Sequence, residues 1–218
     1  MLILGIDTAT SRGSVALVDS ESGIVPKGEV SISLSAAHSE RLIPYIDFLL
    51  SESSLSYGDI DLIAISIGPG SFTGLRVGLA TAKGLAFSLK KPLIAVNSLM
   101  ARAFPFMPLF DRVGAYIDAK RGEVFAAIFE NNSPLLEPII LPLDKFLERC
   151  RSEDVRLIVS EDVAYIKRLK EAGFGALTLY NAISLCELGY AIYSKTGGSD
   201  IDTLSPLYLR DFLPGKKR

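Results

Sequence analysis

The chain has one histidine and two cysteines in 218 residues. With His38 alone, a metal site built on several imidazoles cannot form, and a Ser–His–Asp triad would need His38 as its base. His38 stands at the predicted start of a helix, where a capping or interface role is the simpler interpretation. Cys150 and Cys186 lie in separate helix-like segments and are expected to be buried, reduced thiols. The sequence is therefore poor in catalytic side chains, and we expect no metal site in this chain.

The chain also lacks clustered positive charge and long apolar runs. It has 23 Lys and Arg residues against 25 Asp and Glu residues, a net charge of −2, which argues against binding nucleic acid unaided. The short basic cluster Lys216-Lys217-Arg218 is interpreted as a solvated tail. No apolar run approaches the roughly 20 residues that span a membrane, and Met1–Gly5 is too short for a signal peptide, so we expect a soluble cytoplasmic protein. The mean hydropathy of +0.33 is high and indicates either a rich core or an apolar face covered by a partner.

Alternating apolar strands and amphipathic helices predict an α/β lobe over residues 1–104. One helix is expected over 39–51, with Pro44 near its first turn, and a longer one runs from a Ser71 cap to about Lys90. Strands are expected over residues 2–6, 14–19, 29–34, 62–67 and 93–96.

The second half of the chain begins in the same way as the first. Ile117-Asp118 followed by Arg121-Gly122 resembles Ile6-Asp7 followed by Arg12-Gly13, and in both cases a strand returns after the polar turn. Helices are expected over 162–172 and 181–195, with a strand over 176–180 between them. The sequence therefore predicts a duplicated protein with a lobe at 1–104 and a smaller lobe at 105–218.

A polar turn, Asp7-Thr8-Ala9-Thr10, follows the first predicted strand. A carboxylate at a strand end, followed by hydroxyl and backbone N–H groups, suits a phosphate or the Mg²⁺ that accompanies it. Asp118 would face this turn from the second lobe. Asp7, Thr8, Thr10 and Asp118 are therefore candidates for a vestigial nucleotide or phosphate site. The alternative is a turn stabilised by its own Asp and Thr side chains.

The segment Gly68–Arg76 is the most distinctive in the chain, because a glycine-rich turn joins a strand to a helix start. It is not a Walker loop, since no Gly-Lys-Ser/Thr follows and Lys83 lies about three turns into the helix. Its glycine spacing also departs from the dinucleotide-binding fingerprint. The sequence alone therefore does not assign nucleotide binding to this loop.

Small residues recur every four positions along the same helix, at Gly74, Gly78, Ala82 and Ala86. Gly78 and Gly84 lie in the helix interior, where each costs about 1 kcal/mol relative to alanine. Close approach of a partner's helix would offset that cost, and so would packing against the chain's own sheet. The spacing does not choose between these two explanations.

Five ordered segments together resemble the TsaB (YeaZ) family. They are Ile3–Thr10, His38–Pro44, Gly68–Gly78 with Ala82–Ala86, Ile117–Phe125 and Pro206–Arg210. The Gly70–Arg76 block is highly specific, whereas the Asp7 block is shared across a superfamily. The resemblance implies the two-lobed fold of the actin, sugar-kinase and heat-shock-chaperone superfamily, with duplicated ribonuclease-H-like lobes and a reduced second lobe.

The resemblance also implies a function. Members of the family are non-catalytic subunits in the formation of N6-threonylcarbamoyladenosine (t6A) in tRNAs that read ANN codons. They pair with a larger paralogue, TsaD, which binds a metal and transfers the threonylcarbamoyl group, and the ATPase TsaE joins the pair. The donor, threonylcarbamoyl-AMP, comes from a separate synthase. For this chain we therefore expect no cofactor of its own, a TsaD partner, a homodimer when alone, tRNA contact only through the complex, and no membrane.

The family's docking surface is built from the two helices of the first lobe. Carried over, it covers His38–Leu50 and Phe72–Phe87, where the small-residue stripe was found independently. The interface residues that this implies are His38, Glu40, Arg41, Leu42, Ile46, Leu49, Phe72, Gly74, Leu75, Gly78, Leu79, Ala82 and Ala86.

Two other functions compete with the subunit. One is a free-standing ATP-dependent phosphotransferase of the same superfamily, with Asp7 and Asp118 around Mg²⁺. Short loops, a light second lobe and no evident adenosine pocket count against it. The other is a metal-dependent peptidase, which the single histidine disfavours.

Overall fold

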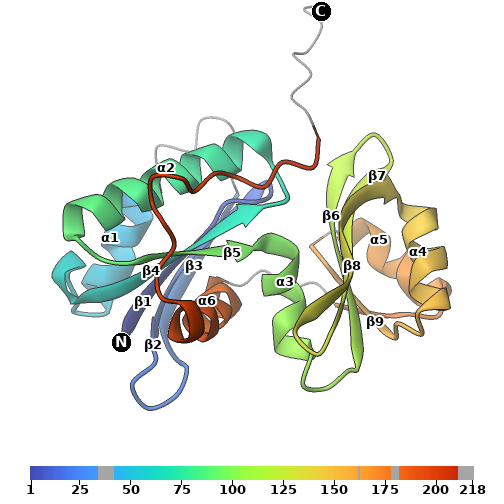
Figure 1. The fold of residues 1–218 in the computed structure, drawn as a ribbon, viewed down its shortest axis with the longest axis horizontal. Coiled ribbons are helices and arrows are strands. Elements are labelled where there is room, and N and C mark those ends of the chain that lie inside the picture. Colours follow the sequence, from blue (N-terminus) through green and yellow to red (C-terminus); the bar gives the residue numbers. More distant parts are fainter. Residues whose placement is uncertain (34–41, 162, 178–181, 211–218) are drawn as a thin grey trace, which may run out of the picture.

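The computed structural model describes residues 1–33, 42–161, 163–177 and 182–210, which form two lobes side by side (Figure 1). The N-terminal sheet contains β1 (Leu2–Asp7), β2 (Arg12–Asp19), β3 (Val25–Ser33), β4 (Ile60–Gly68) and β5 (Leu93–Asn97). The strand order is β3-β2-β1-β4-β5. The pairs β1–β2 and β2–β3 are antiparallel, and the pairs β1–β4 and β4–β5 are parallel. β1 lies at the centre of the sheet, and all of its residues are buried.

The C-terminal sheet repeats this topology. It contains β6 (Arg112–Lys120), β7 (Glu123–Glu130), β8 (Ser133–Pro142), β9 (Leu157–Ser160) and β10 (Gly175–Leu177), in the order β10-β9-β6-β7-β8. Strand for strand, the connections and directions match those of the first sheet, which confirms the predicted duplication. β9 and β10 have four and three residues where β4 and β5 have nine and five, so the second sheet is the smaller.

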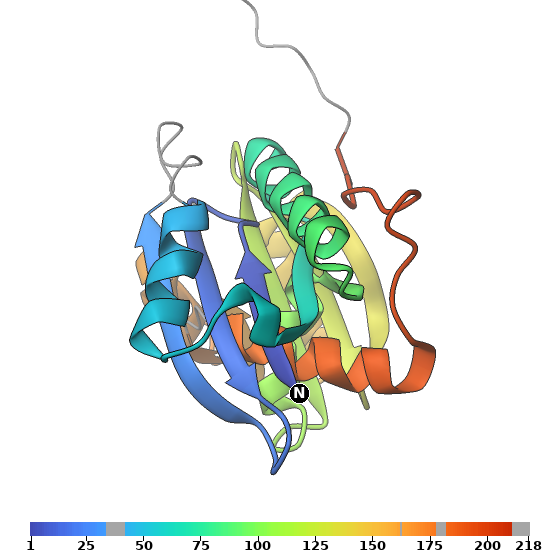
Figure 2. The ribbon, with the colours of Figure 1, turned by 90° about the vertical axis from the view of Figure 1, so that its left-hand side faces the viewer.

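Helices cover both faces of the N-terminal sheet. α1 (Leu42–Glu52) and α2 (Phe72–Leu89) pack on one face, and α6 (Ala182–Thr196) packs on the other (Figures 1 and 2). Ser71 caps α2 as predicted, because its Oγ accepts a hydrogen bond from Gly74 N at 3.2 Å. Pro44 lies in the first turn of α1, as expected. None of the helices within the described ranges is long and apolar enough to cross a membrane.

The two halves of the chain exchange helices. α3 (Ser98–Ala103) follows β5 but packs Leu99 and Ala103 into the core of the C-terminal sheet. Conversely, α6 belongs to the second half of the sequence and packs on β1, β2, β4 and β5. α4 (Leu143–Ser152) and α5 (Val163–Glu171) cover the remaining face of the C-terminal sheet. The boundary predicted at 104/105 separates the two sheets, but it wrongly assigns α6 to the C-terminal lobe.

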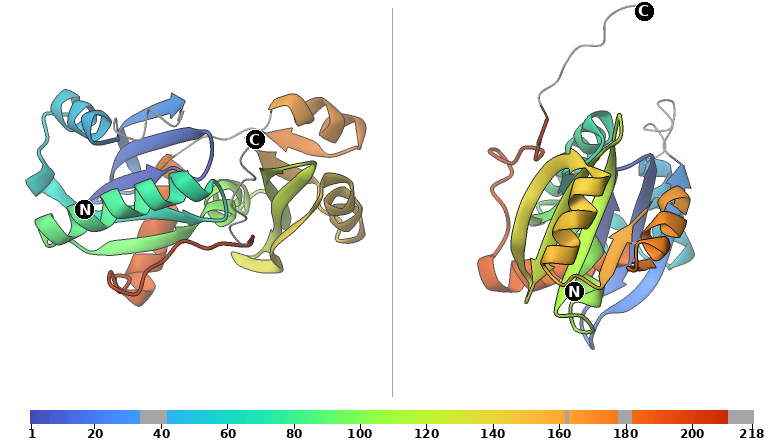
Figure 3. Two further views of the ribbon diagram at one scale, coloured as in Figure 1. Left: turned by 90° about the horizontal axis from the view of Figure 1, so that it is seen from above. Right: turned by 90° about the vertical axis from the view of Figure 1, so that its right-hand side faces the viewer.

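After α6 the chain runs back across both lobes as an extended strap, residues 199–210 (Figure 3). The strap is anchored on the N-terminal lobe, where Ser199 N donates to Leu93 O at 2.7 Å and Leu207 N donates to Ile67 O at 2.7 Å. Leu209 then packs against the core of the C-terminal lobe. The strap thus joins the lobes by packing, in addition to the two places where the chain itself passes between them, from α3 to β6 and from β10 to α6.

Candidate functional site

The candidate site lies where β1 ends and the two lobes meet. Asp7 is the last residue of β1 and is 7% exposed. Its Oδ1 accepts a hydrogen bond from Ala9 N at 2.9 Å, which closes the turn after β1. Its Oδ2 lies 3.0 Å from Nη2 of Arg102. Both carboxylate oxygens are therefore engaged by the protein.

Arg102 reaches this position from α3 and is 4% exposed. Its Nη1 donates to the carbonyl oxygen of Ser98 at 2.6 Å, which orients the guanidinium along the helix. Its Nε donates to Oε1 of Glu161 at 2.8 Å, and Nη2 also pairs with that oxygen. Glu161 directly follows β9, so one buried guanidinium joins carboxylates of the two lobes.

This arrangement does not fit the divalent cation that the fold family implies. Mg²⁺ needs several oxygen ligands in a near-octahedral shell, most of them waters or phosphates. Beside Asp7, that volume is taken by the guanidinium of Arg102, whose positive charge also repels a cation. The described residues likewise contain no group of three or more His, Cys, Asp or Glu side chains placed to hold a metal ion.

The two threonines of the predicted site face away from any shared ligand. Thr8 is 1% exposed, and its Oγ1 lies against Gly78 of α2, without a hydrogen-bond partner in the described part of the chain. Thr10 Oγ1 donates to Arg12 O at 2.8 Å, within its own turn. These contacts favour the interpretation of residues 7–10 as a structural turn.

Asp118, expected to face Asp7, is instead held by its own hairpin. It accepts a hydrogen bond from Lys120 N at 2.8 Å and pairs with Lys120 Nζ at 2.7 Å. Among the described residues, no hydrogen bond or ion pair joins Asp118 to Asp7, Thr8 or Thr10, so the nucleotide site predicted from these four residues stays a prediction. Arg102 and Glu161 were not among the predicted site residues. Arg102 is the single charged residue in the apolar run Leu99–Phe104, and this isolated charge could have indicated a buried ion pair.

The glycines of the distinctive segment make room for the turn after β1. A Cβ atom added at Gly70 would lie 2.2 Å from Ala9 O, and one at Gly74 would lie 2.1 Å from Thr8 O. A Cβ atom added at Gly78 would lie 2.1 Å from Thr8 Oγ1. Real Cβ atoms do not approach other atoms so closely, so glycine is required at each position. The start of α2 is thus closed by the chain's own turn.

The strap covers the other side of the same loop. Gly68 has φ of +111°, which favours glycine, and a Cβ atom there would lie 2.8 Å from Leu207 O. Because Leu207 N also binds Ile67 O, the strap is fixed along the end of β4. The glycine-rich loop therefore lies between the turn after β1 and the strap.

Beside this loop, aromatic and cationic side chains join the strap to α2. The rings of Phe72 and Tyr208 are 4.9 Å apart, and the Arg76 guanidinium lies 3.8 Å above the Phe72 ring. Arg76 Nε also donates to the Tyr208 hydroxyl at 2.9 Å. The sequence named Phe72 as an interface residue, and in the structure it also secures the strap.

Most of the predicted interface residues lie in the core of the N-terminal lobe. They face the sheet rather than solvent, so these side chains do not themselves form an exposed docking surface: Leu42, Ile46, Leu49, Leu75, Gly78, Leu79, Ala82 and Ala86. The small-residue stripe is thus explained by packing on the chain's own sheet and turn. Phe72 and Gly74 are partly exposed, whereas His38, Glu40 and Arg41 lie outside the described residues.

The opposite face of α1 and α2 is exposed and includes several apolar residues among polar ones. Ile43 is 41% exposed, Phe48 is 54% exposed and Phe87 is 82% exposed. Ala80 and Gly84 lie on the exposed side of α2, and a Cβ atom added at Gly84 would meet no atom within 4 Å. We call these five residues the outer helix face.

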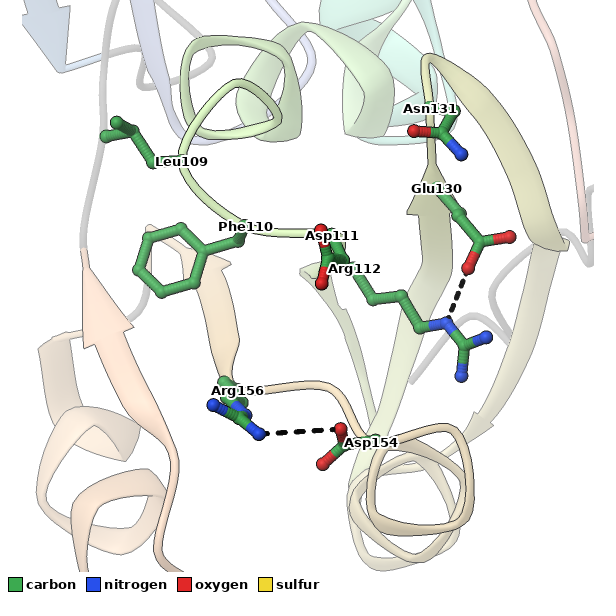
Figure 4. A pocket seen from close by; sticks show the side chains of 8 residues that line it. All are labelled: Leu109, Phe110, Asp111, Arg112, Glu130, Asn131, Asp154 and Arg156. Atoms are coloured by element: carbon green, nitrogen blue, oxygen red, sulfur yellow. Dashed lines mark hydrogen bonds and ion pairs between the residues drawn. The ribbon is translucent and has the colours of Figure 1, made fainter.

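A separate hollow of about 600 Å³ lies at the opposite end of the C-terminal sheet, where β6 and β9 begin (Figure 4). Four of its five charged side chains pair with one another: Arg112 Nε donates to Glu130 Oε1 at 2.7 Å, and Arg156 lies 3.7 Å from Asp154. Arg156 precedes β9 and Glu161 follows it, so this hollow lies at the opposite end of β9 from the contact between Arg102 and Glu161.

The sequence was compared with known proteins. Residues 10–149 match the family model described as "TsaD: tRNA N6-adenosine threonylcarbamoyltransferase". A "tRNA threonylcarbamoyladenosine biosynthesis protein TsaB" from Bacillus subtilis is 30% identical over 220 residues, covering 96% of this chain and 94% of that protein. A tRNA N6-adenosine threonylcarbamoyltransferase from Zymomonas mobilis is 38% identical over 115 residues, 47% of this chain and 32% of that protein.

Solved structures are similar over almost the whole chain. A Pseudomonas aeruginosa protein described as similar to the peptidase YeaZ has a TM-score of 0.77 at 27% identity, covering 96% of this chain and 99% of that one. An inorganic polyphosphate/ATP-glucomannokinase from Arthrobacter has a TM-score of 0.54 at 11% identity, covering 89% and 99%. The second likeness concerns the fold alone, and it agrees with the predicted two-lobed α/β fold.

Proposed function

This chain belongs to the TsaB family of tRNA threonylcarbamoyladenosine biosynthesis proteins, and from that premise we propose that it is a non-catalytic subunit that pairs with the transferase TsaD. In this proposal the chemistry belongs to the partners, together with ATP, Mg²⁺ and the metal that TsaD binds. This chain contributes a rigid docking surface, and TsaE joins the assembled pair.

The observation that carries the pairing is the outer helix face. Phe48 and Phe87 project from adjoining helices on the same side of the lobe, and each is more than half exposed. Full burial of one such side chain stabilises an assembly by about 1.5–3 kcal/mol. The two rings can therefore supply much of the apolar contact of a helix-to-helix interface.

Gly84 supports the same conclusion independently. It lies within the 18-residue α2, where glycine costs about 1 kcal/mol relative to alanine. Apart from its chain neighbours and the backbone of its own helix, no atom lies within 4 Å of its Cβ position, so no packing contact with the rest of the described chain offsets this cost. A glycine on an exposed helix face allows another helix to approach closely. We infer that this helix comes from TsaD, and from a second copy of the chain when TsaD is absent.

The interlobe contacts support the non-catalytic part of the proposal. Asp7 binds Arg102 instead of presenting a free carboxylate, and the turn after β1 closes the start of α2. The fold similarity to a sugar kinase therefore does not extend to an ATP·Mg²⁺ site built on Asp7. With a net charge of −2, the chain is expected to approach tRNA only within the complex.

The pairing is tested by one substitution and one matched control. Phe87→Glu places a charge on the outer helix face, and we expect it to weaken TsaD binding at least about 100-fold, since a charge is buried where a ring was. Leu109→Glu changes a side chain that is 74% exposed in the C-terminal lobe, and we expect TsaD binding to stay within about twofold. Binding is measured by titration calorimetry with purified TsaD. Equal affinity for the two variants would show that the interface lies elsewhere.

A further inference from the structure

Two carboxylates from different lobes share one buried guanidinium, and we propose that Arg102 acts as a built-in cation at the contact between the lobes. It occupies the position that a metal would take beside Asp7, and it ties the lobes together without metal or nucleotide. This inference concerns that contact alone and does not depend on the pairing with TsaD.

The contacts bring three elements to one point. Asp7 ends β1 of the N-terminal lobe, Glu161 follows β9 of the C-terminal lobe, and Arg102 comes from α3 between them. The side chain of Arg102 is 5% exposed, that of Asp7 10% and that of Glu161 7%. The main-chain oxygen of Ser98 accepts a further hydrogen bond from the guanidinium at 2.6 Å. The arginine is thus held in one orientation by its own helix and by both lobes.

Burial makes this cluster an all-or-none contact. A buried charge that loses its partner is strongly destabilising, because the remaining charge stays buried without compensation. If the lobes moved apart, Arg102 would have to leave Asp7 or Glu161 and strand a carboxylate. The triad therefore resists the hinge motion by which two-lobed proteins open and close around ligands.

The charge balance shows why Arg102 stands in for a cation. Among the described residues, the carboxylates of Asp7 and Glu161 both pair with the guanidinium of Arg102, so these three side chains together carry a net charge of −1. Without it, two buried carboxylates would face each other, and such a pair takes up either a proton or a metal ion. Removing Arg102 should therefore expose a cation site that the wild-type chain does not offer.

The contacts of the strap should hold the two lobes together in variants that lack Arg102. Leu207 binds β4 of the N-terminal lobe, and Leu209 packs in the C-terminal lobe. Arg210 Nη1 donates to Ala119 O at 3.2 Å, and its Nη2 pairs with Glu123. Loss of Arg102 should thus loosen the lobes without separating them.

The first test compares Arg102→Met with Arg112→Gln, which breaks a surface ion pair inside one lobe. We expect Arg102→Met to lower the melting temperature by about 10 °C and Arg112→Gln by less than about 2 °C. Hydrogen exchange should rise in Arg102→Met at the turn after β1 and at the end of β9. In Arg102→Lys, the fall in melting temperature and the rise in hydrogen exchange should both be smaller than in Arg102→Met. Exchange no faster in Arg102→Met than in Arg112→Gln would overturn the tie between the lobes.

The second test adds MgCl₂ or MnCl₂ at about 10 mM, with and without ATP. The wild-type melting temperature should stay within about 1 °C, whereas that of Arg102→Met should rise by several degrees. Stabilisation of the wild type by the metal, or none in Arg102→Met, would overturn the cation role. If Arg102→Met does not fold, Glu161→Gln replaces it: it should speed exchange at the same two segments and gain nothing from metal, and unchanged exchange would overturn the proposal.

Discussion

Two glycines of α2 should respond in opposite ways to the same added methyl group. Gly78 faces the turn after β1, whereas Gly84 faces solvent. Six residues at about 100° each place the two positions roughly 240° apart around the helix. The structure therefore assigns Gly78 to the fold and Gly84 to the partner, a separation that the four-residue stripe alone does not reveal.

The magnitudes follow from the surroundings of each glycine. Gly84→Ala removes the helix cost of glycine and meets no atom within 4 Å, so the free energy of unfolding should rise by about 1 kcal/mol. Gly78→Ala has the same gain, but its Cβ would lie 2.1 Å from Thr8 Oγ1 and 3.2 Å from Thr8 Cβ and Cγ2. Overpacking of a core costs about 1–3 kcal/mol, and the buried Thr8 has little room to move. Because the 2.1 Å contact places the overpacking cost in the upper part of that range, we expect a net loss of about 1–2 kcal/mol at Gly78.

Urea unfolding, followed by circular dichroism, measures both changes on matched protein. Thr8→Ala removes the hydroxyl and methyl that the new Cβ would meet, so the pair Thr8→Ala/Gly78→Ala should show favourable coupling in a double-mutant cycle. The reasoning fails if Gly78→Ala is as stable as the wild type, or if Thr8→Ala leaves its loss unchanged. An effect of Gly78→Leu on TsaD binding would report on folding, so Gly84→Leu is the variant that tests docking.

Two further outcomes follow from buried ionisable groups. Burial raises the pKa of the half-buried Glu29; the hydrogen bond from Ala182 N–H opposes this shift, and the negative charge of Asp7 adds to it. The contribution of Glu29 to the free energy of unfolding is therefore fully present below the pKa of the unfolded state, and it is lost as the pH rises through the folded-state pKa. Glu29→Gln should therefore stabilise the chain at pH 7 by less than about 1 kcal/mol and not at pH 4, and a uniform effect at both pH values would contradict this. Burial raises the pKa of Cys150 to about 12 and that of Cys186 further, so neither thiol should react with Ellman's reagent at pH 8 until urea unfolds the chain; rapid labelling of native protein would refute it.

The sequence predicted the elements whose signals are local. The hairpin that opens each half, the Ser71 cap and the helix ends at Gly173 and Gly197 carry their own turn or cap residues. β8 was missed because prolines at 134, 138 and 142 argue against a strand. They are tolerated because β8 is an edge strand that pairs on one side only. α3 was missed because it has six residues and ends at a proline-rich segment.

The site depended on long-range packing that no local pattern encodes. Arg102 and Glu161 are 59 residues apart, and they meet because α3 packs on the sheet of the other half. The sequence predicted that α1 and α2 carry the docking surface, but it did not predict which of their residues are exposed. The direction of each side chain follows from where α1 and α2 seat on the sheet, which buries Ile46 and exposes Phe48.

In the proposed function, this chain activates TsaD through the outer helix face and does not itself perform the transfer. The direct measurement is t6A formed in tRNA, by mass spectrometry, from purified TsaD, TsaE, ATP, Mg²⁺ and threonylcarbamoyl-AMP. Adding this chain should raise the yield severalfold, Gly84→Leu should remove most of that gain, and the chain without TsaD should form none. Product from the chain alone, or full activation by Gly84→Leu, would contradict the account.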